Sequence, residues 1–350
     1  MAAMLESLLI IGSKRTGAIE NAFARAFGRL GVPLVDHFDL EQSSRPFRQN
    51  RVINRLTLHV QHEFIGRNLF RHLKNNSQRY DAVIVFKGMQ LTPAWLARCK
   101  TISKAGAWVN YNPDDPFNLV SRGATNQNVV NSIGHYDIYA TWARRLIPSI
   151  QKAGCESVIY LPFAYDKDNH FPEVRRREEL EGTVTFIGGW DAQREQVLTE
   201  VAEFDLKIYG EGWDRINSRS PLRGKAHPFN IYGEELRQVV TSSKASINIL
   251  RPQNYGSHNM RTFEIPAMRG LMITTSSEEQ NSFFPSGQSC LMYEDAQDLR
   301  NKLRLLMEGA FDIESMKESA YEHRQGNSYD ERAAILHESI AAYCRNRIAA

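Results

Sequence analysis

A basic and an acidic residue, Arg261 and Glu264, lie one helical turn apart in the segment 250–274, LRPQNYGSHNMRTFEIPAMRGLMIT. The pattern predicts a buried strand that ends near Leu250, a polar loop, an amphipathic helix that begins near Asn259, and a second strand. The first turn of a helix has unpaired N–H groups and a partial positive charge, which suit a diphosphate. Arg261 can add charge-assisted hydrogen bonds to phosphate oxygens, and Glu264 can accept hydrogen bonds from the hydroxyl groups of a ribose.

The same segment allows a plainer interpretation. Glu264 is also stabilised near a helix N-terminus without any ligand, and Arg261 is then a surface residue. His258, beside the expected phosphates, is another candidate base, although a single loop histidine is more often structural or a phosphate contact. The spacing alone leaves both interpretations open.

An acidic pair, Asp114 and Asp115, follows an expected strand over 107–110 in the run YNPDDP. Two adjacent carboxylates in a partly buried loop raise the pKa of one of them, as a general base requires. An Asp-Asp-Pro sequence is also common turn chemistry. The pair is therefore a candidate for catalysis or for a turn.

The elements that must position these residues alternate between short apolar runs and helical patterns. This alternation predicts α/β architecture with parallel sheets, in two Rossmann-like, doubly wound domains. We expect a first domain over 1–163, a linker over 164–181, a second domain over 182–327, and a C-terminal helix over 328–350 that packs back on the first domain. The expected strands are 8–11, 32–35, 82–86, 107–110, 138–140, 158–161, 183–187, 206–209, 245–250, 271–274 and 290–293.

Glycine, acidic and basic residues follow many of these strands. Open parallel sheets bind ligands beyond the carboxyl ends of their strands. Two such domains joined by a linker predict a central cleft that both sets of strand ends face. The segments that would line it are Gly12-Ser13, Asp114-Asp115, Gly188-Gly189, Gly210 and the residues after Leu250.

Five motifs resemble those of the CgeB-like glycosyltransferases, a group with the GT-B fold. They are Asn112-Pro113-Asp114-Asp115-Pro116, Leu161-Pro162-Phe163-Ala164, Phe186-Ile187-Gly188-Gly189-x4-Arg194, Ile208-Tyr209-Gly210-x-Gly212-Trp213, and Asn259-x-Arg261-x-Phe263-Glu264-Ile265-Pro266-Ala267-x-x-Gly270 with a later Phe283-Phe284-Pro285-x-Gly287. The resemblance covers about 105–310. It implies that the second domain binds a nucleotide-sugar donor and the first domain binds the acceptor.

The resemblance also implies roles for individual residues. Arg194 matches a position expected near the donor diphosphate. Retaining enzymes of this fold carry a Glu-x7-Glu pair, in which Glu264 matches the second acid and Gly256 stands where the first would be. The retaining outcome is therefore not carried over. The expected donor-binding residues are Gly188, Gly189, Arg194, Tyr209, Gly210, Trp213, His258, Asn259, Arg261 and Glu264, with Gly12, Ser13 and Arg15 as an acceptor-side loop.

No metal site or cofactor is expected, because basic side chains and a helix start can stabilise the diphosphate. The His59-x-x-His62 pair has no matching acid nearby, and the four cysteines lie far apart. This cysteine pattern fits neither a disulfide framework nor a zinc site. The loop Gly12–Gly17 lacks the spacing of a nucleoside triphosphatase loop.

Charge bears on partners and on location. The net charge of +3 does not favour nucleic acid, but residues 45–79 contain eight Lys and Arg against one acid. This basic segment fits an anionic acceptor or a solvated helical surface. The N-terminus lacks the basic start and long apolar run of a signal peptide, which predicts a cytoplasmic location without a transmembrane segment.

We therefore expect a metal-independent glycosyltransferase. Two alternatives stay open. One is a nucleotide-sugar epimerase-like enzyme of the same fold, and the other is a non-catalytic nucleotide- or glycan-binding protein, which the missing first acid favours. The sequence leaves open the sugar, the nucleotide base, the acceptor, the stereochemistry and the oligomeric state.

Overall fold

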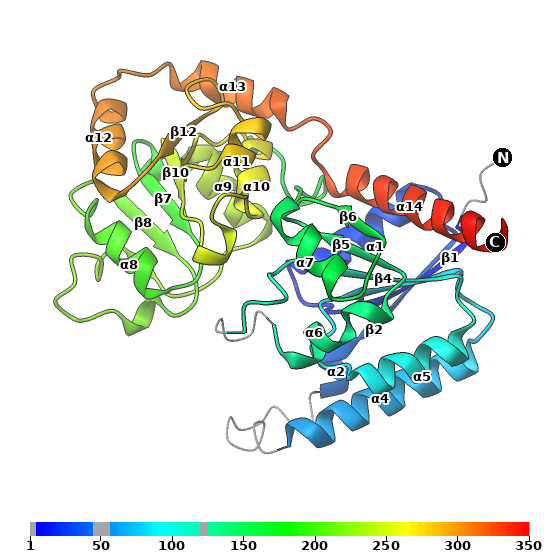
Figure 1. Ribbon diagram of the computed structural model, residues 1–350. Helices are drawn as coiled ribbons and strands as arrows, with labels where there is room; N and C mark the ends of the chain where they lie inside the picture. Colours follow the sequence, from blue (N-terminus) through cyan, green and yellow to red (C-terminus); the bar gives the residue numbers. More distant parts are fainter. Residues whose placement is uncertain (1–4, 45–56, 120–124, 350) are drawn as a thin grey trace. The chain divides into compact units, whose positions relative to one another are not determined.

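The computed structural model describes residues 5–44, 57–119 and 125–349. The chain divides into two compact units, drawn in Figure 1. The first unit contains Met1–Pro162 and Tyr329–Ala350, and the second contains Phe163–Ser328. The cleft expected between the two units stays a prediction.

The first unit is built on a six-stranded parallel sheet with the order β2-β1-β3-β4-β5-β6. Strands β1, β3, β4 and β5 are buried along their whole length, because helices cover both faces of the sheet. The bounds are β1 Ser7–Gly12, β2 Leu34–Asp39, β3 Ala82–Phe86, β4 Ala107–Asn112, β5 Ile138–Thr141 and β6 Val158–Tyr160.

Helices α4 and α5 lie side by side on the first unit (Figure 1). Their close approach depends on Gly66, where a Cβ atom would lie 2.2 Å from Cγ of Trp95. Helix α5 begins with Pro93 in its first turn and the Thr92 hydroxyl oxygen accepting from the N–H of Trp95. The α-helices within the described residues of this unit are α1 Ile19–Arg29, α2 Leu40–Ser44, α4 Leu58–Asn75, α5 Pro93–Ser103, α6 Gln127–Ser132, α7 Ile147–Lys152 and α14 Tyr329–Ala349.

Helix α14 packs on helix α1 of the same unit, although the two lie about three hundred residues apart in sequence. The rings of Phe23 and Tyr329 meet with their centroids 5.2 Å apart. Arg29 Nη2 pairs with Asp330 Oδ1 at 2.6 Å. The first unit is thus completed by a helix that follows the second unit in sequence.

The second unit contains another six-stranded parallel sheet, with the order β12-β11-β10-β7-β8-β9. The strands are β7 Val184–Ile187, β8 Leu206–Tyr209, β9 Ala226–His227, β10 Ala245–Asn248, β11 Met272–Thr275 and β12 Cys290–Tyr293. The helices are α8 Ala192–Thr199, α9 Gly233–Ser242, α10 Arg261–Ala267, α11 Glu278–Phe283, α12 Ala296–Met307 and α13 Ile313–His323.

Residues 164–181, expected as a linker, are counted with the second unit. The segment packs against helix α9: Glu173 Oε2 pairs with Arg237 Nε at 3.2 Å, and the N–H of Glu173 donates to Thr241 Oγ1. Its charged residues therefore anchor it to the unit. Within the described parts of the chain, no helix is both long and apolar enough to cross a bilayer.

Candidate active site

Strands β7 and β10 are neighbours in the second unit's sheet, and the strand order runs in opposite directions from this pair. Ligands of α/β sheets bind beyond the carboxyl ends of strands at such a switch point. Gly188-Gly189 follows β7, and Ile249-Leu250-Arg251 follows β10. The residues that the sequence predicts for donor binding are concentrated here.

The Arg194 side chain connects the two strand ends. Nη1 donates to the carbonyl oxygen of Gly189 at 2.9 Å, and Nη2 donates to that of Ile249 at 3.3 Å. Helix α8 fixes the position of Arg194, because the Asp191 side chain accepts from the N–H of Arg194 at the start of that helix. Burial, reinforced by the nearby charge of Arg251, lowers the pKa of Arg194 to about 10, so it is protonated at neutral pH.

Two further arginines surround this position. Arg251 Nε lies 3.3 Å from Asp191 Oδ2. Arg261 Nε donates to the carbonyl oxygen of Ile187 at 3.2 Å, which brings the α10 arginine to the end of β7. Arg251 and Arg261 both lower the pKa of Arg194, as neighbouring positive charges do. The sequence analysis missed Arg251, although a cation directly after a strand end was the available signal.

The glycines at the site serve close backbone packing. Gly210 has φ of +151°, and a Cβ atom there would lie 2.1 Å from the carbonyl oxygen of Gly188. The N–H of Gly188 donates to the carbonyl oxygen of Tyr209 at 2.8 Å. At the second glycine, Gly189, a Cβ atom would lie 3.6 Å from the carbonyl oxygen of Glu211 and 3.9 Å from Nη2 of Arg251.

Glu264 lies on α10 with only 2% of its surface exposed. Its Oε2 accepts from Nη1 of Arg261, and its Oε1 lies 3.8 Å from Nε2 of His170. His170 Nδ1 accepts from the N–H of Asp166 at 3.0 Å, which assigns the proton to Nε2, facing Glu264. Burial lowers the pKa of His170, and the Glu264 charge opposes this shift. The carboxylate expected to accept ribose hydroxyls is thus engaged by Arg261.

The start of α10 is held by neighbouring amides. Asn259 Oδ1 accepts from the N–H of Thr262 at 3.1 Å, and Asn259 Nδ2 donates to Asn248 Oδ1 at 2.7 Å. Helix α10 has seven residues and contains Pro266. Asn259 therefore links the helix start to the end of β10.

Three residues expected to contact the donor lie in the interior. His258 is fully buried, accepts at Nε2 from the N–H of Phe163 at 3.1 Å, and has Nδ1 3.2 Å from Glu279 Oε2. Trp213 packs its edge on Phe186 and donates from Nε1 to the Gly188 carbonyl at 2.8 Å. Tyr209 is 5% exposed and its ring stacks on that of His227, with centroids 4.9 Å apart.

Tertiary packing buries these three rings, and their direct contact with a donor stays a prediction. Trp213 holds the Gly188 carbonyl by a hydrogen bond, and His258 holds the backbone N–H of Phe163. Tyr255 instead offers an exposed ring in the loop after Arg251; its surface is 47% exposed and its hydroxyl oxygen accepts from Gln193 Nε2. The sequence analysis did not single out this ring.

The acceptor-side loop predicted at Gly12, Ser13 and Arg15 lies at the switch point between β1 and β3 of the first unit's sheet. The N–H of Ser13 donates to Glu20 Oε1 at 2.9 Å, and Ser13 Oγ donates to Glu41 Oε1 at 3.1 Å. Arg15 pairs with Glu41. Burial raises the pKa of Glu20, while the Ser13 hydrogen bond opposes the rise. Both acids were missed by the sequence analysis.

The two candidate bases have cationic partners in the first unit. Asp114 Oδ2 lies 2.5 Å from Nζ of Lys87, which follows β3 with φ of +57°. Asp115 Oδ2 lies 3.3 Å from Arg145 Nη1, and Asp115 Oδ1 accepts from the N–H of Phe117 at 3.0 Å. The turn interpretation of Asp115 therefore describes part of its role.

Asp115 also lines an open hollow of about 450 Å³ in the first unit. Phe117, Arg145 and Lys152 line the same hollow. The lining therefore includes a carboxylate, an aromatic ring and two basic side chains, of which Arg145 pairs with Asp115.

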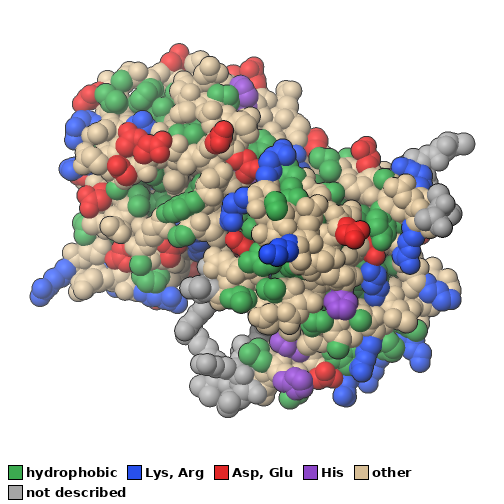
Figure 2. Space-filling view, viewed as in Figure 1, with side chains coloured by type: hydrophobic (Ala, Val, Ile, Leu, Met, Phe, Trp, Pro, Cys, Tyr) green, Lys and Arg blue, Asp and Glu red, His purple; other side chains and the backbone are tan. Residues whose placement is uncertain are grey.

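The basic segment 45–79 is described only in part. Arg67, Arg71 and Lys74 are exposed on α4, and Figure 2 shows Lys, Arg and His side chains over this side of the first unit. The other candidates at its start, Arg45, Arg48, Arg51 and Arg55, lie outside the described residues. His62 Nδ1 lies 3.3 Å from Asn128 Nδ2, and no three His, Cys, Asp or Glu residues converge in the described ranges.

Comparison with known proteins agrees with this architecture. Residues 193–338 match a family model described as glycosyl transferase-like. No curated protein matches the chain. Among solved structures, HepE of Anabaena in complex with UDP and glucose has a TM-score of 0.68 and 11% identity, covering 96% of this chain and 100% of that one.

Two further structures show the same arrangement. Sucrose-phosphate synthase of Thermosynechococcus elongatus has a TM-score of 0.70 and 12% identity, with 99% and 100% of the two chains covered. The lipopolysaccharide outer core galactosyltransferase WaaB, in its apo form, has a TM-score of 0.63 and 11% identity, with 96% and 99% covered. The two parallel sheets with interleaved helices are therefore those of the GT-B fold, as the sequence predicted.

Proposed function

We propose that this chain is a glycosyltransferase that moves a sugar from a nucleoside diphosphate sugar to an acceptor hydroxyl or another nucleophile, without a metal ion. The observation that carries the proposal is the position of Arg194, held by the Gly189 and Ile249 carbonyls at the strand switch point. Arg251 and Arg261 lie close enough to lower its pKa. The glycosyl transferase-like match and the neighbour solved with UDP and glucose support this interpretation.

The arginines suit the charge that develops in this reaction. The acceptor oxygen forms a bond to the anomeric carbon while the bond from that carbon to the diphosphate oxygen breaks. The electron pair of the broken bond stays on the diphosphate, and a base takes the acceptor proton. Preorganised donors for the leaving diphosphate are worth about 10²–10³-fold in rate each. Asp191 and Glu264 each pair with arginines, so three arginines and two acids leave the set net positive.

The first unit is proposed to bind the acceptor. The hollow at Asp115 supplies a carboxylate, and Asp114 and Asp115 are the proposed bases. Arg145 and Lys152 in the same hollow favour an acceptor that carries a negative charge. Glu20 reaches the end of β1 in the same unit, where its buried carboxyl group supports the Ser13 loop.

Thermal unfolding against UDP, GDP, ADP, CDP and dTDP, each with and without EDTA, tests the donor site. A ligand at one hundred times its Kd stabilises the folded protein by about 2.7 kcal/mol, which raises Tm by several degrees. We expect one nucleoside diphosphate to raise Tm by the same amount in the presence and in the absence of EDTA. The shift should shrink in Arg251→Ala and persist in Arg300→Ala, whose side chain is on α12 and pairs with the exposed Glu203.

Two results would contradict the proposal. One is the absence of a shift with any nucleoside diphosphate, and the other is a shift that Arg251→Ala leaves unchanged. A shift that EDTA abolishes would contradict metal independence alone.

A non-catalytic binding protein is the second candidate, and Gly256 favours it. This residue stands where the first acid of the retaining pair would be, has φ of +74°, and has open space where a Cβ atom would lie. Product analysis with the donor sugar distinguishes the candidates. Release of the nucleoside diphosphate with transfer of the sugar supports the enzyme, conversion of the donor alone indicates an epimerase, and binding without any turnover indicates the non-catalytic protein.

A further inference from the structure

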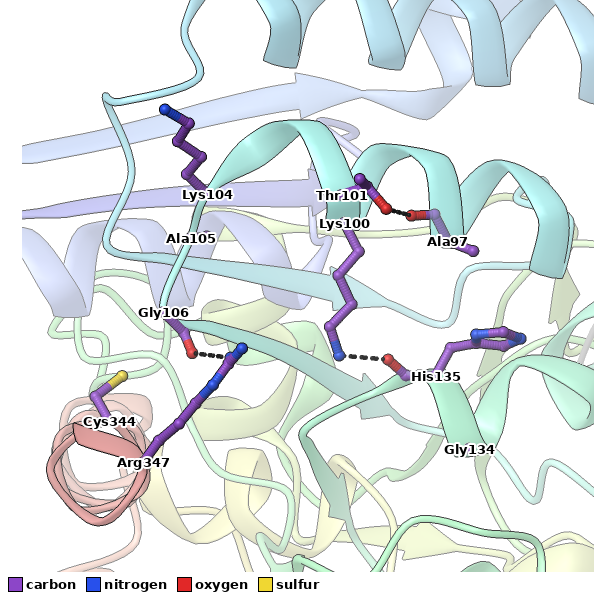
Figure 3. Close-up of a pocket in the computed structure, with 10 residues that line it drawn as sticks. All are labelled: Ala97, Lys100, Thr101, Lys104, Ala105, Gly106, Gly134, His135, Cys344 and Arg347. Carbon is purple, nitrogen blue, oxygen red and sulfur yellow. Dashed lines mark hydrogen bonds between the residues drawn. The ribbon is translucent and has the colours of Figure 1, made fainter. Parts of the chain in front are cut away.

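A second hollow, of about 820 Å³, lies at the amino ends of strands β4 and β5 in the first unit (Figure 3). The end of α5, the residues just before β4 and β5, and the last turns of α14 line it. Strand β4 runs from Ala107 to Asn112, and six residues of strand span about 20 Å. The hollow therefore lies at the amino ends of the strands, whereas Asp114 and Asp115 follow the carboxyl end of β4.

The charged side chains of the hollow are all basic. Lys100, Lys104 and Arg347 line it, and none of the described lining residues is acidic. Lys100 Nζ is neutralised by Asp137 Oδ1 at 2.8 Å. Lys104 and Arg347 have no acidic partner among the residues that the structure describes. Two uncompensated cations therefore border one hollow.

Local packing fixes the α14 side of the hollow. A Cβ atom at Gly106 would lie 3.0 Å from Sγ of Cys344, so the glycine lets α14 approach the start of β4. Tyr343 donates from its hydroxyl to Asp137 Oδ1 at 3.0 Å. Arg347 Nη1 donates to the Gly106 carbonyl at 3.3 Å, as Figure 3 shows. The remaining guanidinium N–H groups of Arg347 are thus presented from a fixed helix.

Lys104 borders the hollow from α5. It ends that helix in the left-handed conformation, with φ of 53°. Its side chain is exposed at the rim, and Figure 3 shows it directed away from Lys100 and Arg347. A lysine side chain is a flexible four-carbon stem with a compact charge, so it can close over an anion. Small residues, among them Ala97, Ala105 and Gly134, leave space between the cations.

We propose that this hollow binds a small molecule that carries a phosphate or diphosphate group, with Lys104 and Arg347 as its charged contacts. The volume falls in the range of about 300–1,000 Å³ that is usual for small-molecule sites. The bound anion would connect α5 with α14. This site is separate from the proposed donor site, which lies in the second unit.

Cys344 provides a local readout. It lines the hollow and is half-buried, whereas Cys99, Cys155 and Cys290 are buried. The experiment measures the rate of Cys344 alkylation by iodoacetamide, by mass spectrometry of the full chain, as inorganic pyrophosphate is added at constant ionic strength. Pyrophosphate should slow alkylation several-fold in the wild type.

The double variant Lys104→Ala/Arg347→Ala should need at least about tenfold more pyrophosphate for the same protection, since each charge-assisted contact contributes substantially. The matched control is Arg98→Ala/Arg345→Ala, which removes two exposed cations from the same two helices outside the lining. Thermal unfolding checks that both variants are folded.

Equal protection in the two double variants would overturn the proposal, and so would the absence of protection in the wild type. Protection by a single-stranded oligonucleotide but not by pyrophosphate would also overturn it, in favour of a polyanion. None of these results depends on nucleoside diphosphate binding in the second unit, so the proposal can fail independently of the proposed function.

Discussion

Arg332 Nε donates to the carbonyl oxygen of Pro162 at 3.1 Å, across 170 residues of sequence. Pro162 is the last residue of the first unit before the chain enters the second, and Arg332 lies in the first turn after the chain returns at Tyr329. The arginine is 4% exposed, and burial lowers its pKa. The Arg332 side chain therefore joins the point where the chain leaves the first unit to the point where it returns.

Replacing Arg332 should destabilise the first unit. Arg332→Met keeps most of the apolar stem but leaves the Pro162 carbonyl without this donor, which costs about 1–3 kcal/mol of unfolding free energy. Urea unfolding followed by tryptophan fluorescence measures the change. Arg345→Met, at an exposed position on the same helix, is the control. Equal unfolding free energies for the two variants would show that the bond is dispensable.

Arg194→Lys tests the bridge between β7 and β10. Lysine keeps the positive charge but has no planar fork with which to reach the Gly189 and Ile249 carbonyls together. We expect nucleoside diphosphate affinity to fall by about tenfold or more, given the usual strength of charge-assisted hydrogen bonds. Isothermal titration calorimetry measures the affinity, and Arg300→Lys on α12 is the control. Unchanged affinity in Arg194→Lys would mean that charge alone is sufficient.

Gly210→Ala should unfold or strongly destabilise the second unit. The new Cβ atom would lie 2.1 Å from the Gly188 carbonyl oxygen at a φ of +151°. Such a clash at a strained backbone position costs upward of about 3 kcal/mol. Thermal unfolding measures it. Gly224→Ala is the matched control because nothing lies within 4 Å of the position that its Cβ atom would take. A Gly210→Ala protein as stable as the Gly224→Ala protein would contradict the packing described here.

We expect the free energy of unfolding to fall in mild acid because of His37 on β2. Burial, with help from Lys14, lowers the pKa of His37 from 6.5 to about 4. Its Nε2 is buried and has no hydrogen-bond partner among the residues that the structure describes. The folded state therefore binds this proton less readily than the unfolded chain. The contribution of neutral His37 to the free energy of unfolding is therefore fully present above pH 6.5, and it is lost as the pH falls toward about 4.

Urea unfolding at a series of pH values between these limits measures the effect. His37→Gln should show a shallower fall in unfolding free energy than the wild type, whereas His59→Gln, at an exposed position on α4, should follow the wild type. Parallel curves for His37→Gln and the wild type would assign the acid sensitivity to other groups.

The sequence predicts the central strands well and the marginal ones poorly. The runs at 8–11 and 82–86 lie within β1 and β3, because strands buried on both faces need continuous apolar residues. The strand expected at 32–35 is found instead at Leu34–Asp39, an edge strand that is only half-buried and contains polar residues. The short strand β9 has no apolar run and was not expected.

The site shows the same division. Arg194 and Arg261 could be placed because they follow strand ends or begin a helix. The second neighbour of the Glu264 carboxylate, after Arg261, could not be placed. His170 is more than ninety residues away in sequence, and only the fold brings its Nε2 within 3.8 Å of Glu264 Oε1. Spacing likewise does not reveal that His258 and Trp213 are buried, since their surroundings come from several separate segments of the second unit.

The discontinuous first unit has a consequence for synthesis on the ribosome. Residues 163–328 emerge as one continuous stretch, so the second unit can fold as soon as it leaves the exit tunnel. The first unit, whose residues up to 162 emerge earlier, must wait for α14 to cover Phe23 on α1. Domains commonly fold in the order in which they are made. Here we instead expect the second unit to complete its fold before the first unit, and nascent chains that stop before residue 329 to lack the ring contact between Tyr329 and Phe23.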